Sequence, residues 1–277
     1  MKNDVKGLYD YHMHSIGSFD GQSTIEQLAE KGISLGLRGI CLTEHHDSNR
    51  TFDEFGFYNH EKQAERVAKA KKKYGDKIEI YSGLEVDFEP SLKKDMIELV
   101  SEFQDLDVKL GSVHVSCFGL QFNFLGSIGK MVLSDADFEM LYKKYYDDIE
   151  ELIRLEFFDV IAHIDYPKRC GVRTLSGNIP SIYSEGMERV MELAAKYEIA
   201  VEINTRNADK GAPLTAPEFA IKKYIECGGK YVTLGSDTHF VGNLANSLYF
   251  GYNILKKYNL GQTIFKDRTP YILPLLD

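Results

Sequence analysis

Histidine and carboxylate residues carry the clearest chemical signal in this chain of 277 residues. Seven of the eight histidines lie at or just beyond the ends of strand-like segments, and only His60 opens a helical pattern. Carboxylates lie beside several of them, as in Glu44-His45-His46-Asp47 and Asp237-Thr238-His239. Imidazole and carboxylate ligands suit zinc, manganese or iron, and the absence of cysteine ligands is typical of a catalytic site. The pattern therefore indicates metal-dependent catalysis.

Two of these motifs place a pair of side chains on one face of a strand. Residues i and i+2 of an extended strand point to the same side, so His12 and His14 can face one metal ion. Asp237 and His239 have the same spacing near the end of a later strand-like segment. There are more candidate ligands than one ion takes, and Glu85 could bridge two ions. Because metals about 3.5–4 Å apart can share a water and bind a phosphoryl oxygen, the residues predict a multinuclear metallohydrolase.

Strand and helix patterns that alternate along the chain must position these side chains. The expected strands are Leu8–His14, Gly39–His45, Glu79–Phe88, Val108–Val115, Val160–Tyr166, Ala200–Asn204 and Tyr231–Ser236. The expected helices are Thr24–Leu35, His60–Tyr74, Leu92–Phe103, Asp135–Leu155, Ser184–Tyr197, Pro217–Cys227 and Leu244–Tyr258. This alternation indicates an α/β fold with a parallel sheet, and seven unbroken βα units favour a closed or nearly closed barrel in one domain, residues 1–277. In such barrels the chemistry lies at the carboxyl ends of the strands, where the histidines fall.

The composition limits the partners of the protein. Forty-two acidic against 33 basic residues give a formal charge of −9, which argues against long nucleic acids or anionic membranes as partners. A small phosphate ester remains possible, because bound metal ions supply positive charge locally. No apolar run approaches the roughly 20 residues that cross a bilayer, and no secretory signal is visible. With four scattered cysteines, we expect a cytoplasmic protein with reduced thiols; the sequence leaves the oligomeric state unknown.

The order of the motifs resembles the polymerase and histidinol phosphatase (PHP) superfamily. It runs from Tyr11 to His239 as His-x-His, Thr-Glu-His, Glu, His, His and Asp-x-His. Within it, Asp10–Ser15, Gly83–Glu85 and His163–Lys168 look like the histidinol-phosphate phosphatase branch. The resemblance implies a distorted (β/α)7 TIM-like barrel with a trinuclear metal site. It also implies hydrolysis of L-histidinol phosphate to L-histidinol and phosphate, a step of histidine biosynthesis.

The resemblance also implies nine metal ligands in three sets, to be filled by two to three divalent transition ions (Zn, Mn or Fe). The first set is His12, His14, Glu85 and Asp237. The second set is Glu85, His114 and His163, with Glu85 bridging. The third set is Asp20, His45 and His239. Some relatives place a histidine where this chain has Asp20, so the third site is expected to be weaker or selective for another ion.

The implied reaction is attack on a phosphomonoester by a metal-bridging hydroxide. Glu85 would hold the two ions together, and Asp237, His239 or a water on the third metal would protonate the leaving alkoxide. Phosphate also needs cations, for which arginine is the best shaped. The first choices for phosphate binding are Arg206 and Arg169, followed by Lys168 and Arg173, with solvated loop charges as the alternative for each.

Several further residues are expected around the substrate. Only one of the adjacent residues His45 and His46 can face the metals, so His46 is expected to touch substrate or hold its loop. Glu44 is expected to orient a ligand imidazole. The amino and imidazole ends of histidinol would contact loop residues, for which the candidates are Phe118, Phe122, Phe124 and Asp165. The irregular stretch Cys117–Ser134 is a possible lid or substrate loop.

Three alternatives stay open. The first is another PHP phosphoesterase, acting on nucleotides, nucleic acid or phosphotyrosine, although the charge disfavours a long polynucleotide. The second is a metal-dependent amidohydrolase, which also begins with His-x-His, although the strand-end glutamate and terminal Asp-x-His fit the phosphoesterase order better. The third is a catalytically inactive metal-binding module, against which the full ligand set argues.

Overall fold

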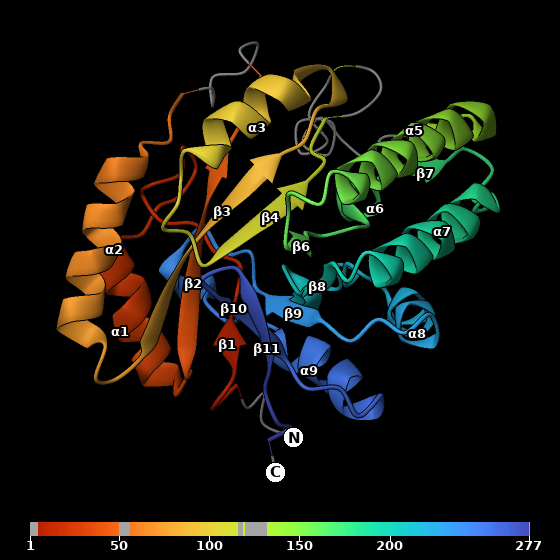
Figure 1. Cartoon of the computed structure of the whole chain (residues 1–277). Coiled ribbons are helices and arrows are strands. Elements are labelled where there is room, and N and C mark those ends of the chain that lie inside the picture. Colours follow the sequence, from red (N-terminus) through yellow and green to blue (C-terminus); the bar gives the residue numbers. More distant parts are fainter. Residues whose placement is uncertain (1–4, 50–55, 116–118, 120–131, 277) are drawn as a thin grey trace.

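Seven parallel strands form the central sheet of the protein. The computed structural model describes residues 5–49, 56–115, 119 and 132–276. The strands of the sheet, in spatial order, are β1 (Tyr9–Asp10), β2 (Gly39–His46), β3 (Glu79–Asp87), β4 (Val108–Ser112), β6 (Val160–Ile161), β8 (Ala200–Asn204) and β9 (Val232–Gly235). Every neighbouring pair is parallel, and spatial order follows chain order. This is the predicted α/β architecture in a single domain (Figure 1).

The first and last strands approach each other and nearly close the sheet into a barrel. The amide of Tyr11 donates to the carbonyl of Leu234 at 2.8 Å, and the amide of Asp237 donates to the carbonyl of His12 at 2.8 Å. Met13 and Thr238 continue this contact as a parallel bridge. Because β1 and β9 meet here, the motifs beginning at His12 and Asp237 lie side by side although 225 residues separate them.

Helices cover the outside of the barrel, as Figure 1 shows. They are α1 (Ile25–Leu35), α2 (His60–Tyr74), α3 (Lys93–Ser101), α5 (Asp135–Arg154), α6 (Tyr166–Arg169), α7 (Ile182–Lys196), α8 (Glu218–Glu226) and α9 (Leu248–Lys257). Local signals explain their ends. At α1, Thr24 and Gln27 form a capping box, and Gly36 ends the helix in the left-handed conformation that glycine adopts without strain. The buried faces pack onto the strands in one continuous core.

Two strand pairs outside the barrel have no counterpart among the predicted elements. Strands β5 (Val132–Leu133) and β7 (Arg173–Thr174) pair in parallel, and β10 (Thr263–Lys266) and β11 (Thr269–Ile272) form an antiparallel hairpin. The hairpin belongs to a second apolar cluster with the residues that line the amino ends of the strands. It contacts β1 through the Gln262 side chain, which accepts from the Tyr9 amide at 3.1 Å and donates to the Tyr9 carbonyl at 2.6 Å.

Two predicted strands were too long by five residues each, because Leu8–His14 is a strand only at Tyr9–Asp10 and Val160–Tyr166 is one only at its start. The segment Val160–Tyr166 forms a strand only to Ile161, and Tyr166 begins the short helix α6. The backbone leaves the extended conformation at His163, which has a φ of +26°, and Pro167 lies in the first turn of α6. No helix within the described ranges has both the length and the apolar character needed to cross a bilayer.

Replacing Tyr11 by phenylalanine tests whether the hairpin contact stabilises the barrel. The buried Tyr11 hydroxyl donates to the carbonyl of Phe265 and accepts from its amide at 3.0 Å. Tyr11→Phe leaves both groups without this partner, and we expect the free energy of unfolding in urea to fall by about 1–2 kcal/mol. Tyr271→Phe on the same hairpin, where the side chain is 49 % exposed, is the control and should change stability by less than about 0.5 kcal/mol. Equal losses in the two variants would contradict this role of Tyr11.

Candidate metal centre

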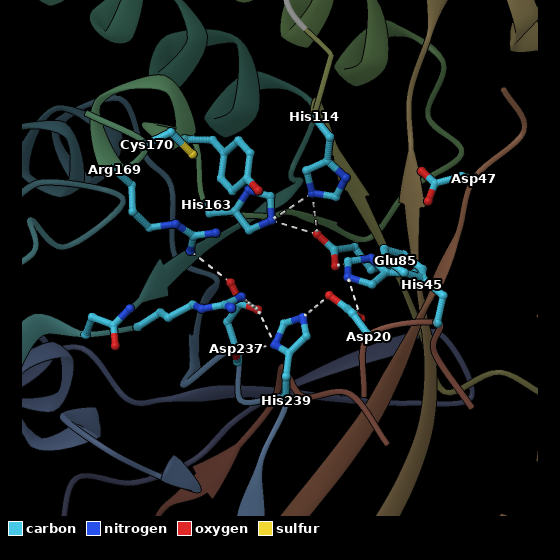
Figure 2. Close-up of a pocket in the computed structure, with 14 residues that line it drawn as sticks. Asp20, His45, Asp47, Glu85, His114, His163, Arg169, Cys170, Asp237 and His239 are labelled. Atoms are coloured by element: carbon cyan, nitrogen blue, oxygen red, sulfur yellow. Dashed lines mark hydrogen bonds and ion pairs between the residues drawn. The ribbon is translucent and has the colours of Figure 1, made fainter. Parts of the chain in front are cut away.

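The nine residues implied as metal ligands meet at the carboxyl ends of the barrel strands. They surround a cavity of about 310 Å³ whose walls include seven of the residues drawn in Figure 2 as an inward-facing cluster: Asp20, His45, Glu85, His114, His163, Asp237 and His239. His12 and His14 lie beneath this surface and are almost fully buried. Six barrel strands or the turns after them contribute to the cluster. The residues that the family resemblance implied as ligands thus lie together in the structure; that they bind metal stays a prediction.

Glu85 occupies the middle of the cluster, and its two carboxylate oxygens face different histidines. Oε2 lies 3.2 Å from His12 Nε2 and 3.4 Å from His14 Nε2. Oε1 lies 2.6 Å from His163 Nε2 and 3.2 Å from His114 Nε2. The carboxylate thus has one oxygen for each of the first two predicted ligand sets, which is the arrangement a bridging ligand needs.

Asp237 completes the first set. Its Oδ1 lies 3.5 Å from His14 Nε2 and 4.0 Å from His12 Nε2. Its φ of +49° is unusual for a residue other than glycine, and such backbone strain is concentrated at functional sites. The turn at this position brings the side chain across the end of β9 toward the two histidines of the β1 segment.

The third set lies on the more open side of the cluster. Asp20 Oδ2 is 2.8 Å from His239 Nε2, and Asp20 Oδ1 is 3.7 Å from His45 Nε2. The rings of His14 and His45 stack with centroids 4.1 Å apart, and His45 Nδ1 also lies 3.1 Å from Glu85 Oε2. The Asp20 side chain is 35 % exposed, whereas Glu85 and Asp237 are buried. Solvent therefore reaches this part of the cluster more easily.

The donor atoms fit divalent metal ions. Ligands about 2.1 Å from a tetrahedral ion lie roughly 3.4 Å from each other. His12 Nε2 and His14 Nε2 are 3.2 Å apart, and His114 Nε2 and His163 Nε2 are 3.4 Å apart. Several overlapping triads of the cluster have all their donor atoms within 4.8 Å. Nitrogen and oxygen lone pairs brought this close in a buried site repel each other unless a cation or protons lie between them, so the donor set suits metal.

Burial and neighbouring charges shift the pKa values of the cluster residues in both directions. Burial raises the pKa of Glu85, but the surrounding imidazoles, His12 and His45 foremost, hold it well below its usual value. Burial lowers the pKa of His14 well below 6.5 and that of His163 to about 4. Although burial opposes this, nearby carboxylates raise the pKa of His12 well above 6.5 and that of His45 to about 10. Histidine ligates metal in its neutral form, so a metal ion would displace protons from these two rings.

Glu44 organises two of the histidines through a serine. Its buried carboxylate accepts from the Ser18 hydroxyl at 2.6 Å and from the Ser15 amide at 3.0 Å. The Ser18 oxygen lies 3.3 Å from His14 Nδ1 and accepts from the His45 amide at 2.9 Å. The predicted orienting role of Glu44 thus operates indirectly, through the loop that follows β1.

Glu202 is a site residue that sequence reasoning missed. The fully buried carboxylate accepts a hydrogen bond from His12 Nδ1 at 2.7 Å and another from the His163 backbone amide at 2.8 Å. Asn204 Nδ2 also donates to it at 3.2 Å and to Asp237 at 3.2 Å. The available signal was the i, i+2 pair of Glu202 and Asn204 on a barrel strand whose expected segment and following turn carry no histidine, like the strand that carries Glu85.

Asp87 positions His114 of the second ligand set, as Glu202 positions His12 of the first. It accepts from the backbone amide of His114 at 2.8 Å and lies 3.7 Å from His114 Nδ1. Burial raises its pKa to about 7. Asp47 lies close to both residues and lines the cavity, so a second carboxylate borders this side of the cluster.

The two arginines predicted first for phosphate binding both line the cavity. Arg169 Nη1 donates to Asp237 Oδ2 at 2.8 Å and to Asn204 Oδ1 at 2.9 Å. Arg206 Nη1 donates to Asp237 Oδ1 at 3.0 Å. Figure 2 shows Arg169 pointing toward Asp237 from the side opposite His239. Both guanidinium groups therefore lie at the edge of the metal cluster, where a bound anion would meet them.

The structure does not bring the other predicted substrate residues to this cavity. Lys168 and Arg173 line a different cavity, because the turn of α6 directs Lys168 away from the cluster and Arg173 lies beyond it in β7. His46 faces the outside of the barrel, where its ring contacts Tyr58 and Phe103 at centroid distances of 6.1 Å each. The alternation of β2 explains this: His45 turns inward, so its neighbour turns outward.

The remaining predicted contacts lie elsewhere or cannot be placed. The Asp165 carboxylate is fully buried and accepts from the Tyr183 hydroxyl at 2.6 Å, away from the cavity lining. The three predicted phenylalanines, Phe118, Phe122 and Phe124, lie outside the described residues, as does most of the possible lid Cys117–Ser134.

The fold and the site together define a barrel enzyme whose buried cluster of histidines and carboxylates suits divalent metal ions. The family model of the PHP domain matches residues 10–206, and the chain belongs to this family. A probable histidinol-phosphatase of Clostridium acetobutylicum is 26 % identical over 94 % of this chain and 98 % of its own. A histidinol-phosphatase of Lactococcus lactis is 26 % identical over 90 % of each chain. The crystal structure of histidinol phosphate phosphatase from Lactococcus lactis, complexed with zinc, L-histidinol and phosphate, matches with a TM-score of 0.81 at 22 % identity, covering 95 % of this chain and 98 % of that one.

Substitution of Glu202 tests its role behind the cluster. In Glu202→Gln the amide cannot accept from both His12 Nδ1 and the His163 amide, so the His12 ring loses its fixed orientation. We expect affinity for the first Zn or Mn ion to fall about 10–100-fold, as for other residues that orient a ligand histidine. Competition titration against a chelating dye measures this affinity. Glu198→Gln, at an exposed residue two positions before β8, is the control, and equal affinity in both variants would contradict the role of Glu202.

Proposed function

We propose that this protein hydrolyses L-histidinol phosphate to L-histidinol and phosphate, using two to three divalent ions. The observation that carries the proposal is the position of Glu85, whose two oxygens face two separate histidine sets beside two arginines. This arrangement suits the hydrolysis of a phosphate ester. The choice of substrate is supported by the histidinol-phosphatase names of relatives that align over nearly the whole chain.

The ligand sets follow the contacts described above. We assign the first ion to His12, His14, Glu85 and Asp237. We assign the second to Glu85, His114 and His163. We assign the third to Asp20, His45 and His239, and expect it to bind more weakly because Asp20 is partly exposed. Zinc, manganese and iron all suit this mixture of imidazole and carboxylate ligands.

Bound divalent ions would act as Lewis acids that lower the pKa of water and neutralise charge on the phosphoryl oxygens. The chain itself supplies the remaining groups. Arg169 and Arg206 present guanidinium groups to the cavity, where their planar forks suit phosphate oxygens. The Arg169 side chain is 10 % exposed and that of Arg206 is 38 % exposed, so Arg169 is held in place while Arg206 can adjust to the substrate.

Asp237 and His239 are the two side chains that could donate a proton to the leaving alkoxide. Although burial raises the pKa of Asp237, Arg206 and Arg169 hold it well below its usual value, so this carboxylate stays ionised and suits ligation. His239 Nδ1 lies 3.0 Å from the Asp237 carbonyl, which can only accept, so Nδ1 carries a proton. His239 Nε2 faces Asp20 at the cavity, and we propose that a proton at this atom serves the leaving group when no third ion occupies it.

The rest of the cavity suits an organic cation. Asp47 lines it opposite the arginines, and the rings of Phe19 and Tyr166 form part of its wall. The ammonium group of histidinol would meet the carboxylate, and its imidazole would pack against the rings. The net charge of −9 repels a polynucleotide, so the substrate that suits this cavity is a small phosphate ester.

A substrate panel tests the proposed function. With Mn, Zn or Fe added separately, we expect kcat/KM for L-histidinol phosphate to exceed that for a nucleotide, a phosphotyrosine peptide and an aryl phosphate by at least about 100-fold. Phosphate release under initial-rate conditions is the measurement. Glu85→Gln, which weakens both main ligand sets, should abolish turnover while retaining the fold by circular dichroism. A faster reaction with any other member of the panel would overturn the substrate assignment.

Neutralising an arginine tests phosphate recognition separately from the metals. Loss of one charge-assisted hydrogen bond should reduce kcat/KM of Arg206→Gln roughly 10–100-fold, mostly through KM. Metal content by mass spectrometry should not change, because Arg206 is not a proposed ligand. Lys222→Gln, an exposed lysine paired with Glu226 on α8, controls for loss of charge and should match the parent. An unchanged KM in Arg206→Gln would contradict this assignment.

A further inference from the structure

A second cavity lies next to the candidate metal centre, on the other side of the short helix α6. Its volume is about 370 Å³, within the range of small-molecule sites. Residues from α5, α6, β7 and α7 line it, and Figure 1 shows α5 and α7 running side by side here. We propose that this cavity binds a small aromatic carboxylate, distinct from the substrate of the barrel.

Aromatic rings form one wall of this second cavity. Phe138 and Tyr142 on α5 lie with ring centroids 4.4 Å apart, and Tyr183 on α7 meets Tyr142 in an edge-to-face contact at 5.5 Å. Val172 and Ile179 add aliphatic surface. A flat ring is the ligand shape that gains most from such walls, because it can pack against the faces and edges of the rings already present.

One polar group in this wall lacks a partner. Tyr142 is fully buried, and within the described ranges its hydroxyl has no hydrogen bond. An unsatisfied buried hydroxyl is costly to a fold. The hydroxyl is itself inaccessible, so a ligand in the second cavity would pack against the wall that contains the Tyr142 ring and would not reach its oxygen.

The charges around the second cavity favour a ligand with one negative charge. Lys168 Nζ donates to the Tyr183 hydroxyl at 3.0 Å, and that hydroxyl donates to the buried Asp165 carboxylate at 2.6 Å. Asp165 thus offsets the charge of Lys168, with 3.9 Å between Nζ and Oδ2. Arg173 makes no ion pair with any residue that the structure describes and is exposed at the rim. One uncompensated guanidinium suits a carboxylate, to which it can donate two parallel hydrogen bonds.

The helix α6 separates the two cavities and belongs to both. Tyr166 and Arg169 line the cavity of the metal cluster, whereas Lys168 lines the second cavity. Arg169 in turn donates to Asp237, a proposed metal ligand. A ligand that holds Lys168 and Tyr183 would therefore also bias the position of Arg169. By linkage, substrate and this ligand then change each other's affinity by the same factor.

Calorimetric titration of the metal-loaded protein with imidazole-4-acetate and indole-3-acetate tests the proposal. We expect at least one to bind with a Kd of about 10–100 µM, and the corresponding amides, which lack the charge, to bind at least about tenfold more weakly. Arg173→Gln should weaken binding about tenfold, whereas Tyr142→Phe, which removes an oxygen that the ligand does not reach, should bind as the parent does. Lys143→Gln, an exposed lysine on α5 that pairs with Asp147, is the matched control and should bind as the parent does.

Control titrations distinguish the second cavity from the metal centre. Binding should persist in Arg206→Gln and in the presence of inorganic phosphate, which would compete only at the metal centre. Loss of binding in Arg206→Gln, or equal affinity in Arg173→Gln and the parent, would overturn the proposal. Absence of binding by both acids at about 1 mM, ten times the weakest expected Kd, would do the same. None of these measurements depends on turnover, so they stand apart from the test of the proposed phosphatase activity.

Discussion

The contact of one buried carboxylate with several imidazoles is the interaction on which the rest of this structure depends. Glu85 is 1 % exposed, and a buried anion is costly unless cations or hydrogen-bond donors surround it. Nitrogen atoms of five histidines lie within 3.4 Å of its two oxygens, and these histidines come from the ends of four strands. The barrel must therefore hold these strand ends around one point, which is also the point where metal ions fit.

Contacts at the seam of the barrel maintain this arrangement. The buried Asp10 carboxylate accepts from the amide of Ser236 at 2.9 Å and from the amide of Ala245 at 3.0 Å. These bonds tie β1 to the turn after β9, so Asp237 reaches the histidines that follow β1. Behind the cluster, Glu202 orients His12 and the backbone of His163 from the neighbouring strand. The site is thus supported from the strands on either side of it.

Hydrophobic periodicity predicted most elements because local signals define them. The helix expected at His60–Tyr74 and the strand expected at Ala200–Asn204 have the predicted bounds. The shortened strand after Val160 and the hairpin at Thr263–Ile272 were not predictable in this way. The first depends on the unusual φ of His163, and in the second only Ile264 and Phe265 bury apolar side chains, in a cluster with residues from several barrel strands.

The sequence by itself indicated most of the histidines and carboxylates that gather at the strand ends, because the i, i+2 spacing and the strand-end positions are local properties of the chain. It also determined the parallel barrel, through the alternation of strands and helices. Only the tertiary structure decided how Glu85 divides its oxygens between two histidine sets, that Glu202 supports His12, and that Lys168 and Arg173 face a second cavity. These relations join residues far apart in the chain, and the direction of a side chain after a strand ends depends on backbone turns that periodicity does not encode.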